Sequence, residues 1–419
     1  TGLNTNALLA YSGNAGIQAG VAYLQPVTTV ATVPTAAQTT ASVATLVQNN
    51  SGGGGGQTFT LTTGIDVVPA TGTMGSNSTI SGVVAANVAG GQTYQTGDTI
   101  NGNSSSRLNL TVVADTGAGI FATVNNLGTI SARNLSAGAI ANAFDGTLWS
   151  NLSNFASNES GAGVVTVNNG SIGTTFSLIT PAVNSAAGLS VGYQAAQTGG
   201  TADTANLSVV NAGRNSGTTA VPNAQDSVLT VLNNSTGTAA GVENVALSTS
   251  GTNILQLALG TDTTKLTVTG SGDNTIRINS ITANSSTITL AGASGKNTLN
   301  VQNNISSNST FTGGSGTSDT LRVQANGINV IGINTTGFEN LRLNSANANG
   351  SISFASAPGF GTVRVDAGAG GGVTNLLGVG GFSNLAFVGA GTTAAAAQQQ
   401  VFNGLTATGG FTGAADTLA

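Results

Sequence analysis

From residue 57 onward, apolar and polar positions alternate in short runs. Leu266 and Val268 flank a Thr, and Leu299 and Val301 repeat this pattern around an Asn. A period of two places the apolar side chains on one face of a β-strand and the polar side chains on the other. Gly, Asn and Asp residues separate the runs, as they do in turns. The pattern therefore predicts a mainly β body made of many short strands.

Three of these strands repeat at a nearly fixed distance. They read TIRI, TLNV and TLRV at 275–278, 298–301 and 320–323. A second phrase reads GVENV, GFENL and GFSNL, and its last two copies, at Gly337 and Gly381, begin two such periods apart. A constant period is typical of solenoids. We predict a parallel β-solenoid or β-roll-like body with coils of about 22 residues, and a β-sandwich that grades into a solenoid is the alternative.

Composition divides the chain into four parts. Residues 1–50 are rich in Ala, Val and Thr and show a weak helical spacing that glycines interrupt, which predicts a short, partly helical segment serving as an anchor or an exchange arm. Residues 51–56 read SGGGGG and form a flexible linker. A β-rich domain is predicted over 57–240 and a β-solenoid repeat domain over 241–419.

Charge is scarce along the whole chain. Charged residues make up 5% of the 419 positions and hydrophobic residues 39%, so we expect a folded protein whose surface is polar but nearly neutral. The net charge is −5, and because the sequence displays no basic stripe, nucleic acid is not expected as a partner. The sequence contains no run of about 18 apolar residues, which a transmembrane helix would require. The N-terminus lacks a signal-peptide pattern and begins at Thr1, which fits a processed chain or a part of a longer precursor.

The sequence lacks the residues on which most enzymes rely. It contains no His and no Cys, which excludes Ser-His-Asp triads, Cys nucleophiles and His-based metal sites. Its Asp and Glu residues are scattered without a clustered pair, so a polysaccharide-active enzyme with two carboxylates is the third hypothesis, after the two non-enzymatic ones below. Phe144, Trp149 and Phe155 are interpreted as a local core plug, with sugar or subunit docking as the alternative. We therefore predict a structural protein and not an enzyme.

Several segments resemble a known family. The stretch 58–110, the phrase GGSGTSDTLRV at 313–323 and the phrase GFENLRL at 337–343 are similar to RTX-type S-layer proteins, which Gram-negative bacteria export by type I secretion. The resemblance implies a secreted, calcium-dependent β-roll outside the cell that assembles with copies of itself into a lattice. It also implies an N-terminal anchor on lipopolysaccharide or another cell-surface glycan. An adhesin passenger domain or a phage tail fibre is the second hypothesis.

The sequence departs from this family at the calcium-binding nonapeptide G-G-x-G-x-D-x-U-x. The stretch 313–319 has one residue too many before its Asp, 102–107 places Arg107 where the acid belongs, and 292–296 contains no acid. The remaining calcium candidates are Asp98, Asp273, Asp319 and Asp416, with Asp66 as a weaker one. For each, we favour a turn residue that caps its own backbone and keep calcium ligation as the alternative. Glu243 and Glu339 are expected to pair with arginines of adjacent coils.

Overall fold

The structure is a computed structural model, and it describes the chain from residue 56 to residue 388 with gaps. The described residues are 56–86, 91–136, 138–161, 163–179, 187–213, 227–232, 241–278, 286–301, 307–323, 329–344, 350–355, 358–366, 374–380 and 382–388. The predicted helical segment 1–50, all of the linker except Gly56, and Asp416 lie outside them.

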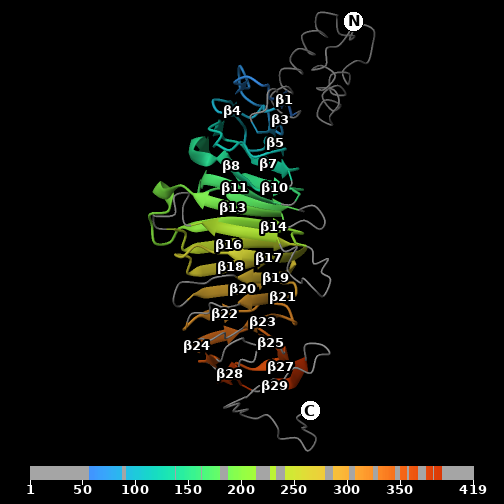
Figure 1. Cartoon of the computed structure of the whole chain (residues 1–419), viewed down its shortest axis with the longest axis vertical. Coiled ribbons are helices and arrows are strands. Elements are labelled where there is room, and N and C mark those ends of the chain that lie inside the picture. The colour runs from blue at the N-terminus through green and yellow to red at the C-terminus, as the bar shows by residue number, and fades with distance from the viewer. Residues whose placement is uncertain are drawn as a thin grey trace, which may run out of the picture.

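The described chain is a parallel β-solenoid, as the sequence predicts. Its strands stack as rungs along the long axis of the molecule, with the N-terminal coils at one end and the C-terminal coils at the other (Figure 1). The strands form three parallel sheets that contain 14, 11 and 4 described strands. In the described residues, no helix is long and apolar enough to cross a membrane.

The 14-stranded sheet runs along one side of the solenoid. Its strands are, in order, β1 (Thr58–Thr60), β3 (Thr79–Val84), β5 (Arg107–Val112), β7 (Thr129–Asn134), β10 (Asn154–Asn158), β12 (Thr175–Ile179), β14 (Thr204–Val210), β16 (Asn244–Ser250), β18 (Lys265–Gly270), β20 (Thr287–Ala293), β22 (Thr310–Thr312), β24 (Asn329–Thr336), β26 (Gly350–Phe354) and β28 (Thr374–Leu377). Because β14 pairs directly with β16, this sheet continues across residue 240.

Two further sheets complete the coils. The 11-stranded sheet contains β8 (Ile140–Asp145), β11 (Gly163–Gly170), β13 (Ala187–Tyr193), β15 (Ser227–Leu232), β17 (Thr252–Ala258), β19 (Asp273–Ile278), β21 (Asn297–Val301), β23 (Thr320–Val323), β25 (Asn340–Asn344), β27 (Phe360–Asp366) and β29 (Phe382–Val388). The four-stranded sheet of the N-terminal coils contains β2 (Val67–Val68), β4 (Thr99–Asn101), β6 (Thr123–Asn125) and β9 (Trp149–Ser150). Two single-turn 3-10 helices, η2 (Gly146–Leu148) and η3 (Ala195–Gln197), lie between strands.

The strand register confirms the predicted period. Ile276 pairs with Leu299 and Leu299 pairs with Leu321, so residues that are one predicted period apart face each other in adjacent coils. Leu341 and Leu385 are likewise separated by one intervening coil. The first copy of the second phrase behaves differently, because its Val245 lies in the 14-stranded sheet. The phrase therefore occurs at the start of strands in both sheets, and it does not repeat strictly with the coils.

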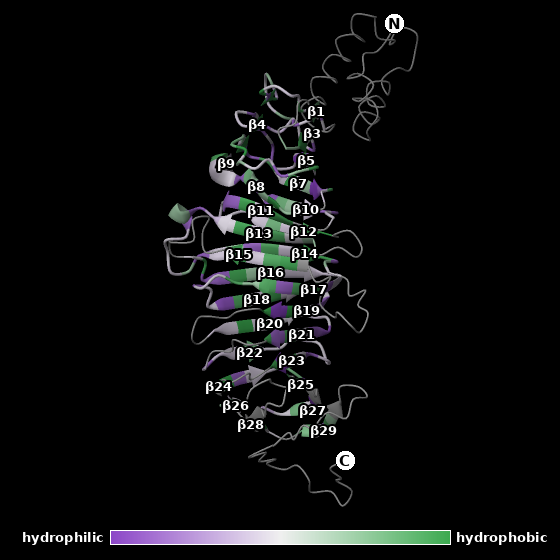
Figure 2. Cartoon of the chain, viewed as in Figure 1, coloured by the Kyte–Doolittle hydropathy of each residue, from purple (hydrophilic) through white to green (hydrophobic). Residues whose placement is uncertain are grey.

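A continuous apolar core fills the interior of the solenoid. The inward residues of successive coils, among them Val268, Leu299 and Leu321, are fully buried. The core extends from Leu61 to Val379 within the described chain. Figure 2 shows the resulting alternation of hydrophobic and hydrophilic residues along the strands. Each coil buries its apolar face on its neighbours, which is the stacking that makes solenoids cooperative.

The aromatic residues of 144–155 form the predicted core plug. Phe144 and Phe155 are fully buried and Trp149 is nearly so. The ring of Phe155 lies 5.1 Å from that of Phe144 in an edge-to-face arrangement and 5.8 Å from that of Trp149 in a stacked one. Phe176 and Tyr193 extend the cluster into the next coils. These rings pack against each other, which confirms the core interpretation over sugar docking.

Candidate functional site

One corner of the C-terminal coils carries a ladder of buried asparagines. Asn253, Asn274 and Asn297 stand at the start of β17, β19 and β21 and are at most 3% exposed. The side-chain amide of Asn253 donates to Asn274 Oδ1 at 3.0 Å, and that of Asn274 donates to Asn297 Oδ1 at 2.9 Å. The amide of Asn297 donates to Asp319 Oδ1 at 3.2 Å. We call these four residues the asparagine ladder, and its last member is an acid that can only accept.

A column of glycines supports the ladder from the adjacent turn. Gly251, Gly272 and Gly295 each precede a ladder asparagine by two positions. The amides of Asn274 and Asn297 donate back to the carbonyls of Gly272 and Gly295 at 2.7 Å. A Cβ added at Gly295 would lie 2.3 Å from the carbonyl oxygen of Gly272, so the coils approach too closely here for any side chain. The triplet G-x-N is therefore the corner unit of these coils, and 292–296, which the sequence presents as a degraded calcium cage, includes the start of one.

The described acids among the calcium candidates cap backbone groups. Asp319 is fully buried and accepts from the N–H of Asn297 through Oδ1 and from the N–H of Gly314 through Oδ2. Asp273 is exposed, and its Oδ1 accepts from the N–H of Lys296. Asp319 thus caps an N–H of its own turn, as the favoured interpretation expected, and also one of a neighbouring coil, whereas the described contact of Asp273 is with a neighbouring coil.

The two acids of the N-terminal coils, Asp98 and Asp66, also cap backbone N–H groups. Asp98 is fully buried, and its two oxygens accept from the N–H groups of Asp66 and Gln95 at 2.9 and 2.7 Å. Asp66 accepts from the N–H and the hydroxyl of Thr62. Desolvation by burial raises the pKa of Asp98 above its usual value, although the two N–H groups act in the opposite direction. The charge of Asp66 adds to the rise in this pKa.

The fold brings together acids that the sequence leaves scattered. Asp66 and Asp98 meet across one pair of coils, and two Glu residues each reach an Asp in the preceding coil. Glu243 Oε2 accepts from the N–H of Asp203 at 2.8 Å, and Glu339 Oε2 accepts from the N–H of Asp319 at 2.7 Å. Each carboxylate thus accepts from a backbone N–H of the preceding coil, and the expected pairing of Glu243 and Glu339 with arginines stays a prediction. These contacts thus lock coils together through backbone groups.

Backbone N–H groups already engage the carboxylates of Asp98 and Asp319. Calcium takes six to eight oxygen ligands, whereas both carboxylate oxygens of Asp98 and of Asp319 already accept from N–H donors. Within the described ranges, no three Asp or Glu residues come together in a group that could hold a metal ion. Asp273 caps through a single oxygen at an exposed corner, and Asp416 lies outside the described residues.

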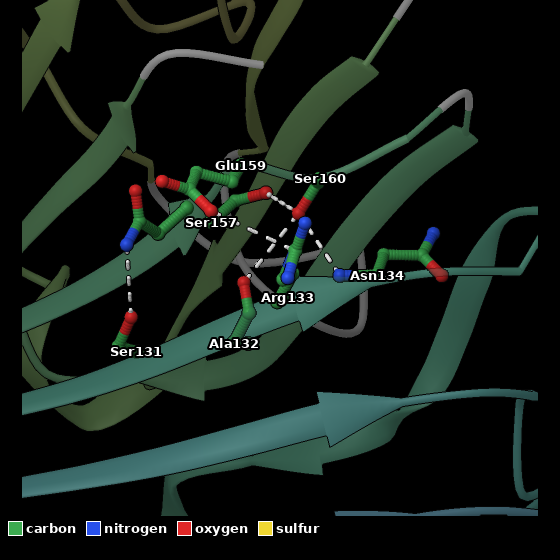
Figure 3. A network of polar contacts seen from close by, with 8 residues as sticks. Ser131, Ala132, Arg133, Asn134, Ser157, Glu159 and Ser160 are labelled. Carbon is green, nitrogen blue, oxygen red and sulfur yellow. Dashed lines mark hydrogen bonds and ion pairs between the residues drawn. The ribbon is translucent and has the colours of Figure 1, made fainter. Parts of the chain in front are cut away.

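A second buried polar corner lies at the ends of β7 and β10. The hydroxyls of Ser157 and Ser160 are 2.9 Å apart, and Ser160 Oγ accepts from the N–H of Asn134 at 3.1 Å. At the surface beside them, Arg133 and Glu159 approach to 3.7 Å (Figure 3). Both charged side chains are more than half exposed. The buried serines thus link the two strand ends by hydrogen bonds, while the exposed ion pair contributes little stability.

Two columns of residues on the outer side of the 14-stranded sheet are almost free of charge, although Arg133 and Lys265 lie beside them on β7 and β18. We call these two columns together the neutral face. The first contains Thr58, Thr79, Arg107, Thr129, Asn154, Thr175, Asn206, Ala246, Thr267, Thr289, Thr312 and Thr336. The second contains Thr60, Ser81, Asn109, Ser131, Ala156, Ser177, Ser208, Ser248 and Thr269. Within these two columns, Arg107 alone is charged.

The outer side of the 11-stranded sheet carries the opposite feature. Arg277, Asn300, Arg322, Arg342 and Arg364 are register partners in five successive coils. The described side chains next to them in the sequence are buried in the core, so these five side chains lie on the outer side of the sheet. We call these five residues the arginine column. It holds four of the nine basic residues of the chain, and it corrects our expectation that no basic stripe exists.

Sequence reasoning missed three of these features for identifiable reasons. The G-x-N triplets recur at the coil period, and the phrases TLRV, NLRL and TVRV place the arginines at equivalent positions, so both signals are present in the sequence. The cross-coil contacts of the acids leave no comparable signal, because they depend on the register between strands of adjacent coils.

No family model, no curated protein and no solved structure matches the chain.

Proposed function

We propose that this chain is a structural subunit of a self-assembling surface layer outside a Gram-negative bacterial cell, and that it performs no catalysis. The resemblance of 58–110, 313–323 and 337–343 to RTX-type S-layer proteins suggests this role. A rigid solenoid with a fully buried core suits a protein whose task is to hold shape and contact its own copies. Its function resides in the assembled sheet.

The neutral face is the observation that carries the proposal. Its Thr, Ser and Asn side chains present hydroxyls and amides from β1 to β24 in one column and from β1 to β18 in the other, with Arg107 as the single cation within the two columns. Surfaces with little net charge associate readily, because no like-charge repulsion keeps copies apart. Interface centres are also poor in charged residues. Many weak contacts repeated along one face add up to a stable lattice.

Calcium and a cell-surface glycan belong to the proposal as partners. Since Asp98 and Asp319 are already engaged by N–H groups, the carboxylates to test as calcium ligands are those of Asp273 and Asp416. Lipopolysaccharide or another surface glycan is the proposed anchor ligand, with residues 1–50 as the proposed anchor. A truncation that lacks 1–56 is expected to assemble in solution but to detach from cells, and normal coating by this variant would contradict the anchor.

Electron microscopy of the purified chain tests assembly directly. We expect ordered sheets, imaged once with calcium and once with a chelator. Sheets in calcium alone would make the ion part of the contact, and sheets under both conditions would mean that neutral contacts suffice. A chain that forms no ordered array in either condition would overturn the proposal. Trimers or host-cell binding would then favour an adhesin or a tail fibre.

Charge placed on the neutral face provides the matched variant. Thr267 and Thr312 occupy the same column in alternate coils, so a Thr267→Glu/Thr312→Glu chain adds two charges that do not oppose each other directly. Repulsion between copies should then abolish the sheets while the far-ultraviolet circular dichroism stays unchanged. The Thr267→Ser/Thr312→Ser chain is the control and should assemble normally. Equal assembly of both variants would exclude this face as the contact.

A further inference from the structure

An exposed apolar patch lies on the outer side of the four-stranded sheet. It consists of four large apolar side chains that are between 43 and 72% exposed, Ile65, Val67, Phe121 and Leu148, and we call them the apolar patch. Within the described ranges, two of the three remaining exposed apolar side chains of this size also belong to the N-terminal coils. Single exposed apolar residues are common, whereas neighbouring ones mark a contact surface.

The register of the four-stranded sheet brings the patch together. Val67 pairs with Thr99, and Thr99 pairs with Thr123. The pairing of β6 with β9 continues this column to Leu148. Neighbouring strands lie about 4.8 Å apart, so the column extends over roughly 14 Å along the axis.

A second column lies two positions earlier and contains Ile65, Gly97 and Phe121. The N–H of Gly97 donates to the carbonyl oxygen of Phe121 at 3.1 Å. A Cβ added at Gly97 would lie 3.2 Å from Ile65 Cδ1, so the side chain of Ile65 lies against the glycine. Among the residues of the two columns, Thr99 and Thr123 alone have polar side chains, and none is charged. The patch is therefore an apolar surface without an electrostatic component.

The part of the chain that precedes the patch matches it in chemistry. Residues 1–65 contain no Asp, Glu, Lys or Arg, and the first charged residue is Asp66. Ile17, Val21 and Leu24 follow the spacing of one face of a helix. An uncharged segment with such side chains is stabilised when it buries them against another apolar surface. The patch offers such a surface.

The connection to the solenoid also favours this segment over a second molecule. Gly56, where the linker 51–56 ends, precedes Ile65 by nine positions, and β1 and β4 lie at the same end of the solenoid (Figure 1). Six extended residues span at most about 20 Å, which is comparable to the length of the patch. A short flexible linker gives the tethered segment an effective concentration in the millimolar range. Docking within one chain therefore prevails over docking on another copy.

We propose that residues 1–50 dock on the apolar patch of their own chain. The side chains of Ile17, Val21 and Leu24 pack against the patch, and the linker 51–56 leads from the docked segment into β1. The segment thereby covers the outer side of the four-stranded sheet, and it holds the proposed anchor at this end of the solenoid. This docking takes place within a single chain and does not depend on the proposed surface layer.

Cleavage of the full chain by chymotrypsin at Tyr11 and Tyr23 tests the docking. A docked segment is cleaved only after it leaves the patch, so the rate follows the population of the undocked state. The Ile65→Ser/Leu148→Ser variant should be cleaved at least about tenfold faster than the unmodified chain, because two apolar side chains no longer contribute to the contact.

A matched control changes two exposed apolar residues outside the patch. Val113 and Leu135 are as exposed as members of the patch, but they follow β5 and β7 of the 14-stranded sheet. The Val113→Ser/Leu135→Ser variant should be cleaved at the rate of the unmodified chain. Equal thermal unfolding of both variants shows that the comparison concerns docking and not the stability of the coils.

A cysteine placed at the patch gives a second reading, because the chain contains none. Thr123→Cys should react with a maleimide at least about tenfold faster when Ile17, Val21 and Leu24 are replaced by Ser, because the segment then leaves the patch. Thr275, a half-buried strand residue like Thr123, is the control. Thr275→Cys should react at the same rate in both backgrounds.

Three results would overturn the proposal. The first is equal cleavage of the patch variant and its control. The second is a maleimide rate at position 123 that does not change when the apolar side chains of the segment are replaced. The third is protection that increases with protein concentration, because this would place the segment on a second copy.

Discussion

The N-terminal and C-terminal coils of the solenoid achieve the same stacking by different means. The first coils vary in length and include a third, four-stranded sheet, as shown by the register partners from β1 to β10, which are Thr58, Thr79, Arg107, Thr129 and Asn154. From β16 to β22 the coil length is nearly constant, with the partners Asn244, Lys265, Thr287 and Thr310. These regular coils repeat one corner unit, the G-x-N triplet. The irregular coils cannot repeat a corner, and they rely on large aromatic side chains and on individual caps such as Asp98.

This difference teaches where each half is vulnerable. A single ring that contacts several coils concentrates stability at one residue in the N-terminal part. A ladder distributes it over equivalent residues, each of which contributes about one hydrogen bond on each side. Substitutions in the two halves should therefore differ in size and in how far their effects spread along the axis.

The largest effect is expected at the aromatic plug. Phe155→Ala removes a fully buried ring that contacts Phe144, Trp149 and Phe176. The cavity should lower the free energy of unfolding by about 3–5 kcal/mol. Urea unfolding measures the loss, and hydrogen exchange should locate it in the N-terminal coils. Phe121→Ala is the control, because that ring is 43% exposed, and an equal loss there would contradict the plug.

Next in size is a change in the glycine column. Gly295→Ala places a methyl group 2.3 Å from the carbonyl oxygen of Gly272, so the two coils must separate locally. We expect a loss of about 2–3 kcal/mol in urea unfolding. Gly173→Ala is the matched control, since a Cβ there meets nothing within 4 Å. If both variants unfold at the same urea concentration, close coil packing at the corner is not what stabilises this half.

A smaller loss is expected in the asparagine ladder. Asn274→Ala deletes the donor to Gly272 and Asn297 and the acceptor for Asn253, and it leaves buried groups without partners. The cost should be about 1–3 kcal/mol. Hydrogen exchange should show it in β17, β19 and β21 while the N-terminal coils stay protected. Asn125→Ala breaks an exposed amide pair with Asn101, and it should change little.

The smallest effect concerns pH and Asp98. Burial raises the pKa of this carboxyl in the folded chain, so the folded state binds the proton more tightly than the unfolded state. Stability from this group is therefore lost as pH rises through the interval between the two pKa values, and it stays constant above. Unfolding of the N-terminal coils, followed by Trp149 fluorescence from about pH 3 to about pH 7, should show this slope. Asp98→Asn should flatten it, and an unchanged slope would assign it to another group.

The sequence by itself determined the strands, the length of the repeating coil and the absence of His and Cys side chains. Alternation in Leu299 and Val301 placed them in the core because apolar residues must leave water, and the spacing of 275–278, 298–301 and 320–323 set the coil length. The aromatic plug was also predictable. Three large rings that are close in a Gly- and Ser-rich sequence lose most contact with water when they pack against each other. These are consequences of local pattern and of the hydrophobic effect, which act on each segment separately.

The tertiary structure alone decided which polar residues of different coils meet. The number of residues from one coil to the next is not constant and reaches its maximum between the register partners Thr204 and Asn244. A shift of one position would turn each side chain to the other face. For this reason the sequence did not reveal that Glu339 reaches Asp319 or that Asp98 caps the backbone of the preceding coil. The arginine column likewise exists because the register of five coils aligns. Core packing fixes that register, and the polar contacts follow from it.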